Sequence, residues 1–128
     1  MNPTATAAKT VLIVDDEKDL VETLTVLLQA KGPFRVESAY DGEAGVEKAR
    51  TTRPDLLLVD LILPGMDGKE VCRRLQADPA TKDIPIILMT ALPPWRAESS
   101  VDGHTVLFKP FDAESLLGTL GRFFVGAR

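Results

Sequence analysis

The chain has 128 residues, of which 45% are hydrophobic and 27% are charged, and its formal net charge is −4. This length fits one domain with a core of its own, and the composition excludes a disordered chain. The acidic balance argues against nucleic acid as a direct partner, and no apolar stretch has the length of a membrane span. A lone Cys72 excludes an internal disulfide, and the first residues lack a signal-peptide pattern. We therefore expect a soluble cytoplasmic protein without membrane contact.

Short apolar runs alternate with segments whose apolar residues recur at helical spacing. Residues 1–9 are predicted to form a flexible leader, and residues 10–126 a single domain. The apolar runs are rich in Val, Ile and Leu, as expected for strands buried on both faces. In the first part of the chain we predict strands at about residues 10–14, 34–39 and 56–59, and helices at about residues 18–31, 41–50 and 67–77.

The second part of the chain is less regular. A fourth strand is predicted at about residues 84–89, a fifth at about residues 105–108, and a last helix from Asp112. The segment between these two strands is bounded by Pro93-Pro94 and by Asp102-Gly103, and it holds few apolar residues. We therefore predict a shortened or irregular fourth helix.

Alternation of strand and helix predicts an α/β fold with a parallel sheet and helices on both faces. With five strands, the leading topology is the flavodoxin-like (βα)5 doubly wound sheet in the order 2-1-3-4-5. In that order the first and third strands are neighbours. Asp15, Asp16 and Asp60 would then lie side by side, beyond the carboxyl ends of the strands, where ligands bind in such sheets.

Three carboxylates at one sheet edge repel one another unless a cation joins them. Mg²⁺ (or Mn²⁺) suits this set, because it is a hard cation that prefers oxygen ligands. We predict Asp16 and Asp60 as direct ligands and Asp15 as a ligand through a metal-bound water. A backbone carbonyl near Ile62 completes the protein's share of the site.

Two further polar residues follow the later strands and suggest a phosphate site beside the metal. Asp60 can act as a nucleophile that forms an aspartyl phosphate. Phosphoryl transfer depends mainly on positioning and on neutralising charge. The Lys109 ammonium and the Thr90 hydroxyl are the groups suited to bind the phosphoryl oxygens.

Four motifs carry a resemblance to a known family: Val14-Asp-Asp-Glu17, Asp60-Leu-Ile-Leu-Pro-Gly-Met-Asp-Gly68, Thr90-Ala91 and Lys109-Pro110-Phe111. In this order they resemble the receiver domain of bacterial two-component response regulators, and stand-alone CheY-like receivers in particular.

The resemblance implies a signalling domain, not a metabolic enzyme. It implies phosphoryl transfer to Asp60 from a histidine kinase or phosphotransfer protein, slow self-dephosphorylation, and a cis peptide between Lys109 and Pro110. It also implies that protein–protein contacts relay the state to a downstream target, which the sequence does not identify.

The chain departs from the family's pattern at several positions. The aromatic residue usual three positions before the lysine is replaced by Val106, which is stiff and small, so we expect an atypical, muted switch unless Phe108 substitutes for it. The segment from Thr90 to Lys109 is shorter than usual in the family, so we expect an altered signalling surface or the absence of the family's common mode of dimerisation. The apolar Ile62 and Leu92 beside the site predict slow loss of phosphate, because they cannot orient an attacking water.

Three alternative functions compete with this interpretation. A flavin-binding flavodoxin needs a phosphate-cradling loop where Asp15-Asp16-Glu17 stands, and these carboxylates would repel phosphate. An aspartate-nucleophile phosphohydrolase needs a general acid where Ile62 stands. A phosphorylation-independent interaction module with the receiver fold remains the main alternative. Both a stand-alone receiver and a part of a longer regulator fit the sequence.

Overall fold

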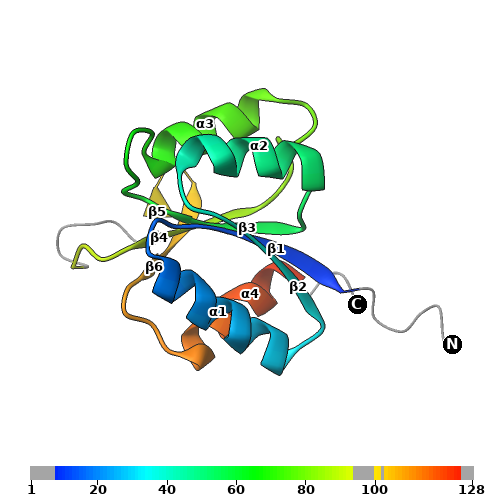
Figure 1. Ribbon diagram of the computed structural model, residues 1–128, viewed down its shortest axis with the longest axis vertical. Coiled ribbons are helices and arrows are strands. Elements are labelled where there is room, and N and C mark those ends of the chain that lie inside the picture. Colours follow the sequence, from blue (N-terminus) through cyan, green and yellow to red (C-terminus); the bar gives the residue numbers. More distant parts are fainter. Residues whose placement is uncertain (1–7, 94–99, 102, 125–128) are drawn as a thin grey trace, which may run out of the picture.

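The computed structural model describes residues 8–93, 100–101 and 103–124, and its core is one sheet between two layers of helices. Figure 1 shows helices on both faces of the sheet. The upper layer in that view holds α2 (Gly42–Thr52) and α3 (Gly68–Ala77), and the lower layer holds α1 (Lys18–Lys31) and α4 (Ala113–Phe124). The predicted α/β fold with helices on both faces is confirmed.

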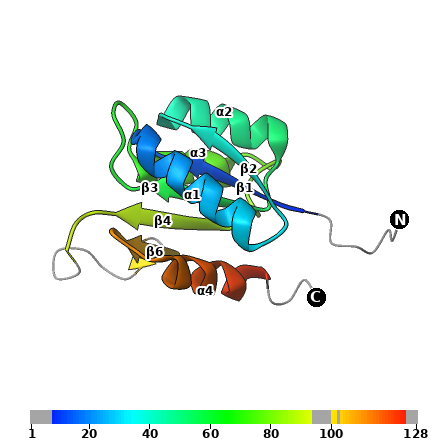
Figure 2. The same cartoon turned by 60° about the horizontal axis from the view of Figure 1, so that its bottom comes forward.

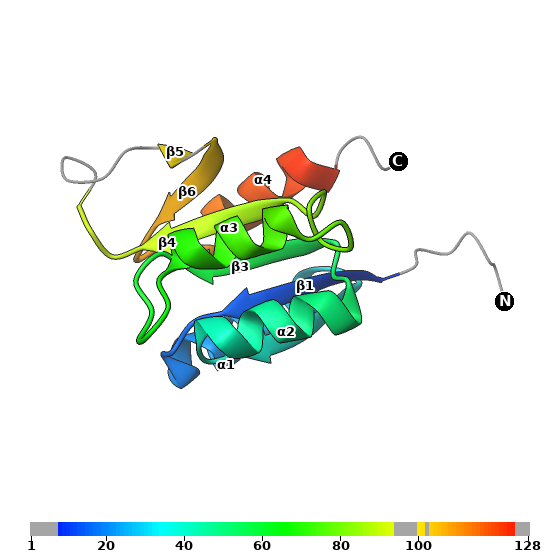
Figure 3. The ribbon, with the colours of Figure 1, turned by 90° about the horizontal axis from the view of Figure 1, so that it is seen from above.

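Five parallel strands form the sheet, and a short antiparallel strand extends one edge. The order is β2-β1-β3-β4-β6-β5, so the parallel part has the predicted order 2-1-3-4-5. Figure 3 shows β5 beside β6, at the edge farthest from β1. The strands are β1 (Lys9–Val14), β2 (Phe34–Ala39), β3 (Leu56–Asp60), β4 (Ile86–Thr90), β5 (Ser100–Val101) and β6 (His104–Phe108).

The connection between β4 and β6 differs from a regular helical crossover. Ser100 and Val101, which the sequence places at the end of the irregular helix, pair with Thr105 and His104 as the antiparallel strand β5. Four helices are present within the described ranges, which fits a shortened or irregular fourth helix. Residues 94–99, where the rest of that helix was predicted, lie outside the described residues.

The central strands are buried on both faces, as their apolar composition predicted. Leu12 and Leu57 belong to the cluster that packs against α2 and α3, whereas Val11 and Leu56 belong to the cluster that packs against α1 and α4. Full burial of one such side chain contributes about 1.5–3 kcal/mol. A slip by one residue would exchange the two sets of side chains, so the register of these strands, and with it the alignment of their carboxyl ends, is strongly fixed.

Both boundaries of β4 differ from the sequence prediction. β4 begins at Ile86, two residues later than predicted; Pro85 has no N–H to donate, although its carbonyl accepts a hydrogen bond from the Leu57 N–H at 3.0 Å. β4 also extends through Thr90, which is therefore the last residue of the strand.

Within the described ranges, none of the helices combines the length and the apolar character that a membrane crossing requires.

Candidate functional site

The carboxyl ends of β1 and β3 bring three carboxylates together. β1 and β3 are hydrogen-bonded neighbours in which Val14 pairs with Val59, so the residues that follow these two lie at the same edge. One carboxylate oxygen each from Asp15, Asp16 and Asp60 lie within 4.8 Å of one another. Asp15 and Asp60 are buried, and Asp16 is exposed to solvent. These hard oxygen donors fit Mg²⁺ or Mn²⁺.

Asp60 is held by two contacts and by the close approach of the following loop. Its Oδ1 accepts a hydrogen bond from the Ile62 N–H at 3.1 Å, and its Oδ2 accepts one from Lys109 Nζ at 3.1 Å. The loop folds back until Gly68 donates its N–H to the Leu61 carbonyl at 2.8 Å. A Cβ at Gly68 would lie 2.6 Å from the Asp60 carbonyl oxygen, so this position requires glycine.

Lys109 reaches the acidic cluster from the end of β6. Its Nζ lies 2.7 Å from Asp15 Oδ2 and 3.1 Å from Asp60 Oδ2, so one ammonium joins the two buried carboxylates. The Lys109 N–H also donates to the Thr90 carbonyl at 2.7 Å, which fixes the end of β6 beside β4. The peptide bond between Lys109 and Pro110 is cis, as the family resemblance implied.

Sequence reasoning missed one partner of Lys109 that lies outside the three-aspartate cluster. Glu17 Oε1 lies 3.1 Å from Lys109 Nζ, although the two residues are 92 positions apart in the chain. The only sequence signal was the place of Glu17 directly after the two aspartates. That place does not reveal that its side chain turns toward Lys109.

The environment shifts the pKa values of the paired groups. Burial raises the pKa of Asp60, and the hydrogen bond from Ile62 and the charge of Lys109 offset only part of that rise, because Asp15 adds repulsion. Burial by itself lowers the pKa of Lys109, but the hydrogen bond to Asp15 and the charge of Asp60 outweigh it, so this pKa is raised. Lys109 therefore stays a cation at neutral pH.

The remaining predicted site residues lie next to this cluster. Thr90 is buried at the end of β4, and its Oγ1 accepts a hydrogen bond from the Leu92 N–H at 3.1 Å. The Ile62 side chain is 61% exposed beside Asp60. The use of the Ile62 carbonyl as a metal ligand stays a prediction.

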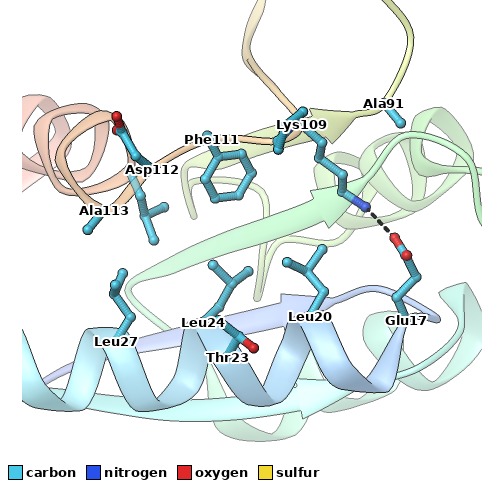
Figure 4. Close-up of a pocket in the computed structure, with 12 residues that line it drawn as sticks. Glu17, Leu20, Thr23, Leu24, Leu27, Ala91, Lys109, Phe111, Asp112 and Ala113 are labelled. Carbon is cyan, nitrogen blue, oxygen red and sulfur yellow. Dashed lines mark hydrogen bonds and ion pairs between the residues drawn. The ribbon is translucent and has the colours of Figure 1, made fainter.

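An apolar groove adjoins the cluster on the α1 and α4 face of the sheet. It has a volume of about 470 Å³, and Glu17 and Lys109 lie at one of its ends. Figure 4 shows the ion pair between them, together with leucine side chains that rise from α1 toward the chain after β6. In Figure 2 the ribbon of β4 is visible between α1 and α4. Its apolar lining includes Leu20, Leu24, Leu27, Phe111 and Leu116.

The fold is a flavodoxin-like α/β domain, and three carboxylates that suit a divalent cation lie beyond the carboxyl ends of β1 and β3. The chain belongs to the response regulator receiver domain family, which it matches over residues 11–120. Receiver domains are signalling domains of two-component systems, and they interact with histidine kinases or phosphotransfer proteins.

Individual relatives agree with this assignment. The chain is 38% identical over 112 residues to the DNA-binding dual master transcriptional regulator RpaA of Synechocystis sp., a match that covers 84% of this chain and 45% of that protein. It therefore spans less than half the length of this relative.

Solved structures give the same result. The chemotaxis protein CheY4 of Vibrio cholerae is 34% identical, with a TM-score of 0.80 over 91% of this chain and 99% of that chain. The receiver domain of the sensor histidine kinase PA1611 of Pseudomonas aeruginosa is 27% identical, with a TM-score of 0.80 over 93% of this chain and 99% of that chain. The latter structure has a magnesium ion coordinated in its active-site cleft.

Proposed function

We propose that Asp60 accepts a phosphoryl group from a histidine kinase or phosphotransfer protein, and that the phosphorylated state is relayed by protein–protein contacts in the cytoplasm. The observation that carries this proposal is the buried Asp60 carboxylate, which has an ammonium on one oxygen and a cluster of carboxylates beside it. A buried nucleophile with a fixed cation and a site for a second cation is what phosphoryl transfer requires.

In this step a carboxylate oxygen of Asp60 forms a bond to phosphorus while the bond between phosphorus and the donor breaks. With a phosphohistidine donor, the imidazole nitrogen keeps the electron pair of the broken bond and takes up a proton. Lys109 offsets charge on the phosphoryl oxygens, and Thr90 lies at the neighbouring strand end, where its hydroxyl can donate to one of them. Asp60 enters this reaction as a carboxylate, the form that can attack phosphorus.

The acidic cluster would hold a divalent cation, Mg²⁺ or Mn²⁺. Asp16 and Asp60 would be its direct ligands, Asp15 would act through a bound water, and the Ile62 carbonyl would supply a further oxygen; the support is that the three carboxylates lie within 4.8 Å of one another. When bound, the ion neutralises charge on the transferred phosphoryl group. The support for this assignment is the donor set itself, which contains only oxygen atoms at a strand edge.

The switch that follows phosphorylation is atypical. Val106 is only 7% exposed and belongs to the core cluster against α2 and α3, and Phe108 packs on the same cluster. A packed valine with a stiff χ1 offers no aromatic ring to rotate. The relay therefore depends on other surfaces, and the groove beside Lys109 suits contact with the protein that delivers the phosphoryl group.

Exposure of the chain to acetyl phosphate with Mg²⁺, followed by intact-mass measurement, tests this function. We expect a gain of one phosphoryl group, which Asp60→Asn abolishes. Asp83→Asn, the same change at an exposed position, is the matched control and keeps the gain. Equal uptake by the Asp60→Asn variant would contradict the proposal. No uptake with any phosphodonor would favour the phosphorylation-independent interaction module instead.

A further inference from the structure

Glu17 makes two contacts with the site, and its side chain does not cap α1, the helix that follows it. It is the N-cap residue of α1, a position where Ser, Thr, Asp and Asn are preferred because they cap the first turn, yet its side chain makes no capping hydrogen bond. Its N–H donates to Asp15 Oδ1 at 2.8 Å, and its Oε1 accepts from Lys109 Nζ at 3.1 Å. The carboxylate of Glu17 is therefore directed at Lys109.

The three carboxylates around Lys109 match the three N–H donors of its ammonium. Asp15 and Asp60 are buried, and the Lys109 side chain is 10% exposed, whereas the Glu17 side chain is 64% exposed. An exposed ion pair is weak, so Glu17 has the weakest hold of the three on the ammonium. With all three contacts in place, no N–H of Lys109 remains for a phosphoryl oxygen.

We propose that Glu17 is a positioning residue that restrains Lys109 and thereby slows phosphoryl transfer to Asp60. This inference rests on the proposed function. To donate to a phosphoryl oxygen, Lys109 must release one carboxylate, and Glu17 is the exposed partner that neither accepts the phosphoryl group nor belongs to the acidic cluster around Asp16. Breaking that contact is part of the barrier, so loss of the contact accelerates the reaction.

Two substitutions at Glu17 separate the contact from the charge. Glu17→Gln keeps the length of the side chain and removes its charge. Glu17→Asp keeps the charge but withdraws the carboxylate by about 1.5 Å, the length of one C–C bond. Asp is also a preferred N-cap residue, so this variant is expected to fold. Glu22→Gln removes one charge from an exposed position of the same helix and is the matched control.

Initial rates of phosphoryl uptake from acetyl phosphate with Mg²⁺, read by intact mass, test the restraint. We expect Glu17→Gln and Glu17→Asp each to react about two- to fivefold faster than the wild-type chain, the range that an exposed ion pair allows. Glu22→Gln is expected to react at the wild-type rate. A wild-type rate in Glu17→Asp, or equal acceleration in Glu22→Gln, would show that charge alone matters and would overturn the proposal.

The ¹⁵N NMR signal of the Lys109 ammonium provides a readout that does not depend on phosphoryl transfer. Glu17→Gln is expected to shift this signal and to speed the exchange of its protons with water, and Glu22→Gln is expected to leave it unchanged. An unchanged Lys109 signal in Glu17→Gln would refute the contact itself. A wild-type chain that takes up no phosphoryl group would instead refute the proposed function and the restraint with it, even if the Lys109 signal shifted.

Discussion

The acidic site at the carboxyl ends of β1 and β3 differs in its construction from β6, the strand that is expected to pass on the phosphorylated state. At the edge, Asp15 and Asp60 are each fixed by two contacts, one from a backbone N–H and one from Lys109. On β6, Val106 is an ordinary core residue beside Leu88, and the strand's outer partner β5 is two residues long. The carboxylates and the ammonium are therefore held in place at the carboxyl end of the sheet, whereas β6 has no aromatic ring at position 106.

The largest effect is expected at the edge itself, from Lys109→Ala. This change leaves the buried Asp15 and Asp60 without their cation, and breaking a buried ion pair costs about 3–5 kcal/mol. Urea unfolding at neutral pH without divalent cations measures the loss. Lys69→Ala, at an exposed position of α3, is the control and should change the free energy of unfolding by less than about 0.5 kcal/mol.

Mg²⁺ should recover part of the stability lost in Lys109→Ala, because a cation that binds only the folded state stabilises it. A loss as small as that of the Lys69→Ala control would show that the acidic cluster does not depend on Lys109 for its order.

The next effect is expected on the relay strand, from Val106→Phe. Because Val106 is packed in the core cluster, the larger ring should overpack the core and cost about 1–3 kcal/mol. Thermal or urea unfolding measures this cost. The same substitution at Val26, which is exposed on α1, should be nearly neutral. If Val106→Phe were also neutral, the core would have room for an aromatic switch residue, and the contrast between edge and relay would weaken.

A smaller and pH-dependent effect is expected from Asp60→Asn. Because folding raises the pKa of Asp60, the folded state holds this proton more readily than the unfolded chain. The stability that this raised pKa confers is fully present below pH 3.8, the ordinary pKa of an aspartate. It is lost as the pH rises through the raised pKa of the folded state. Asp60→Asn avoids that loss, so it should raise the melting temperature at pH 7 in the absence of divalent cations.

The advantage of Asp60→Asn should shrink as the pH is lowered toward 3.8, where Asp60 becomes protonated in both states. Melting temperatures of both chains over this range check the sign. If the advantage of Asp60→Asn in melting temperature grew on acidification, the folded state would stabilise Asp60 as an anion. The effect of Lys109 on the pKa of Asp60 would then outweigh that of burial.

The smallest effect is expected from Ile62→Asn, which concerns a rate and not the fold. Its side chain is 61% exposed, so stability should change by less than about 0.5 kcal/mol. An amide can orient an attacking water, and one hydrogen bond of about 0.5–1.5 kcal/mol would speed loss of phosphate by about two- to tenfold. The decay of the phosphorylated mass over time measures this, and Ile62→Leu should decay like the wild-type chain.

Much of the site was predictable because four of its residues follow or close an apolar run. Asp15, Asp60, Thr90 and Lys109 follow or close runs of Val, Ile, Leu, Met and Phe, and parallel strands bring such positions to one side. The contact between Glu17 and Lys109 was not predictable, because it depends on the direction of two long side chains that start from different elements.

The strand β5 was also beyond the sequence prediction. Its two residues, Ser100 and Val101, carry no periodicity, and only pairing with Thr105 and His104 makes them a strand. The start of β4 was predicted too early because the apolar run includes Pro85. Proline has no N–H to donate to the sheet, and the hydrophobic pattern alone does not take this into account.

The most direct test of the account locates the phosphoryl group on the chain. Borohydride reduces an aspartyl phosphate to homoserine, so treatment after incubation with acetyl phosphate and Mg²⁺, followed by peptide mass spectrometry, identifies the acceptor. We predict homoserine at position 60, and its loss when Mg²⁺ is withheld. Homoserine at Asp15 or Asp16 with none at Asp60 would contradict the assignment of Asp60 as the phosphoryl acceptor.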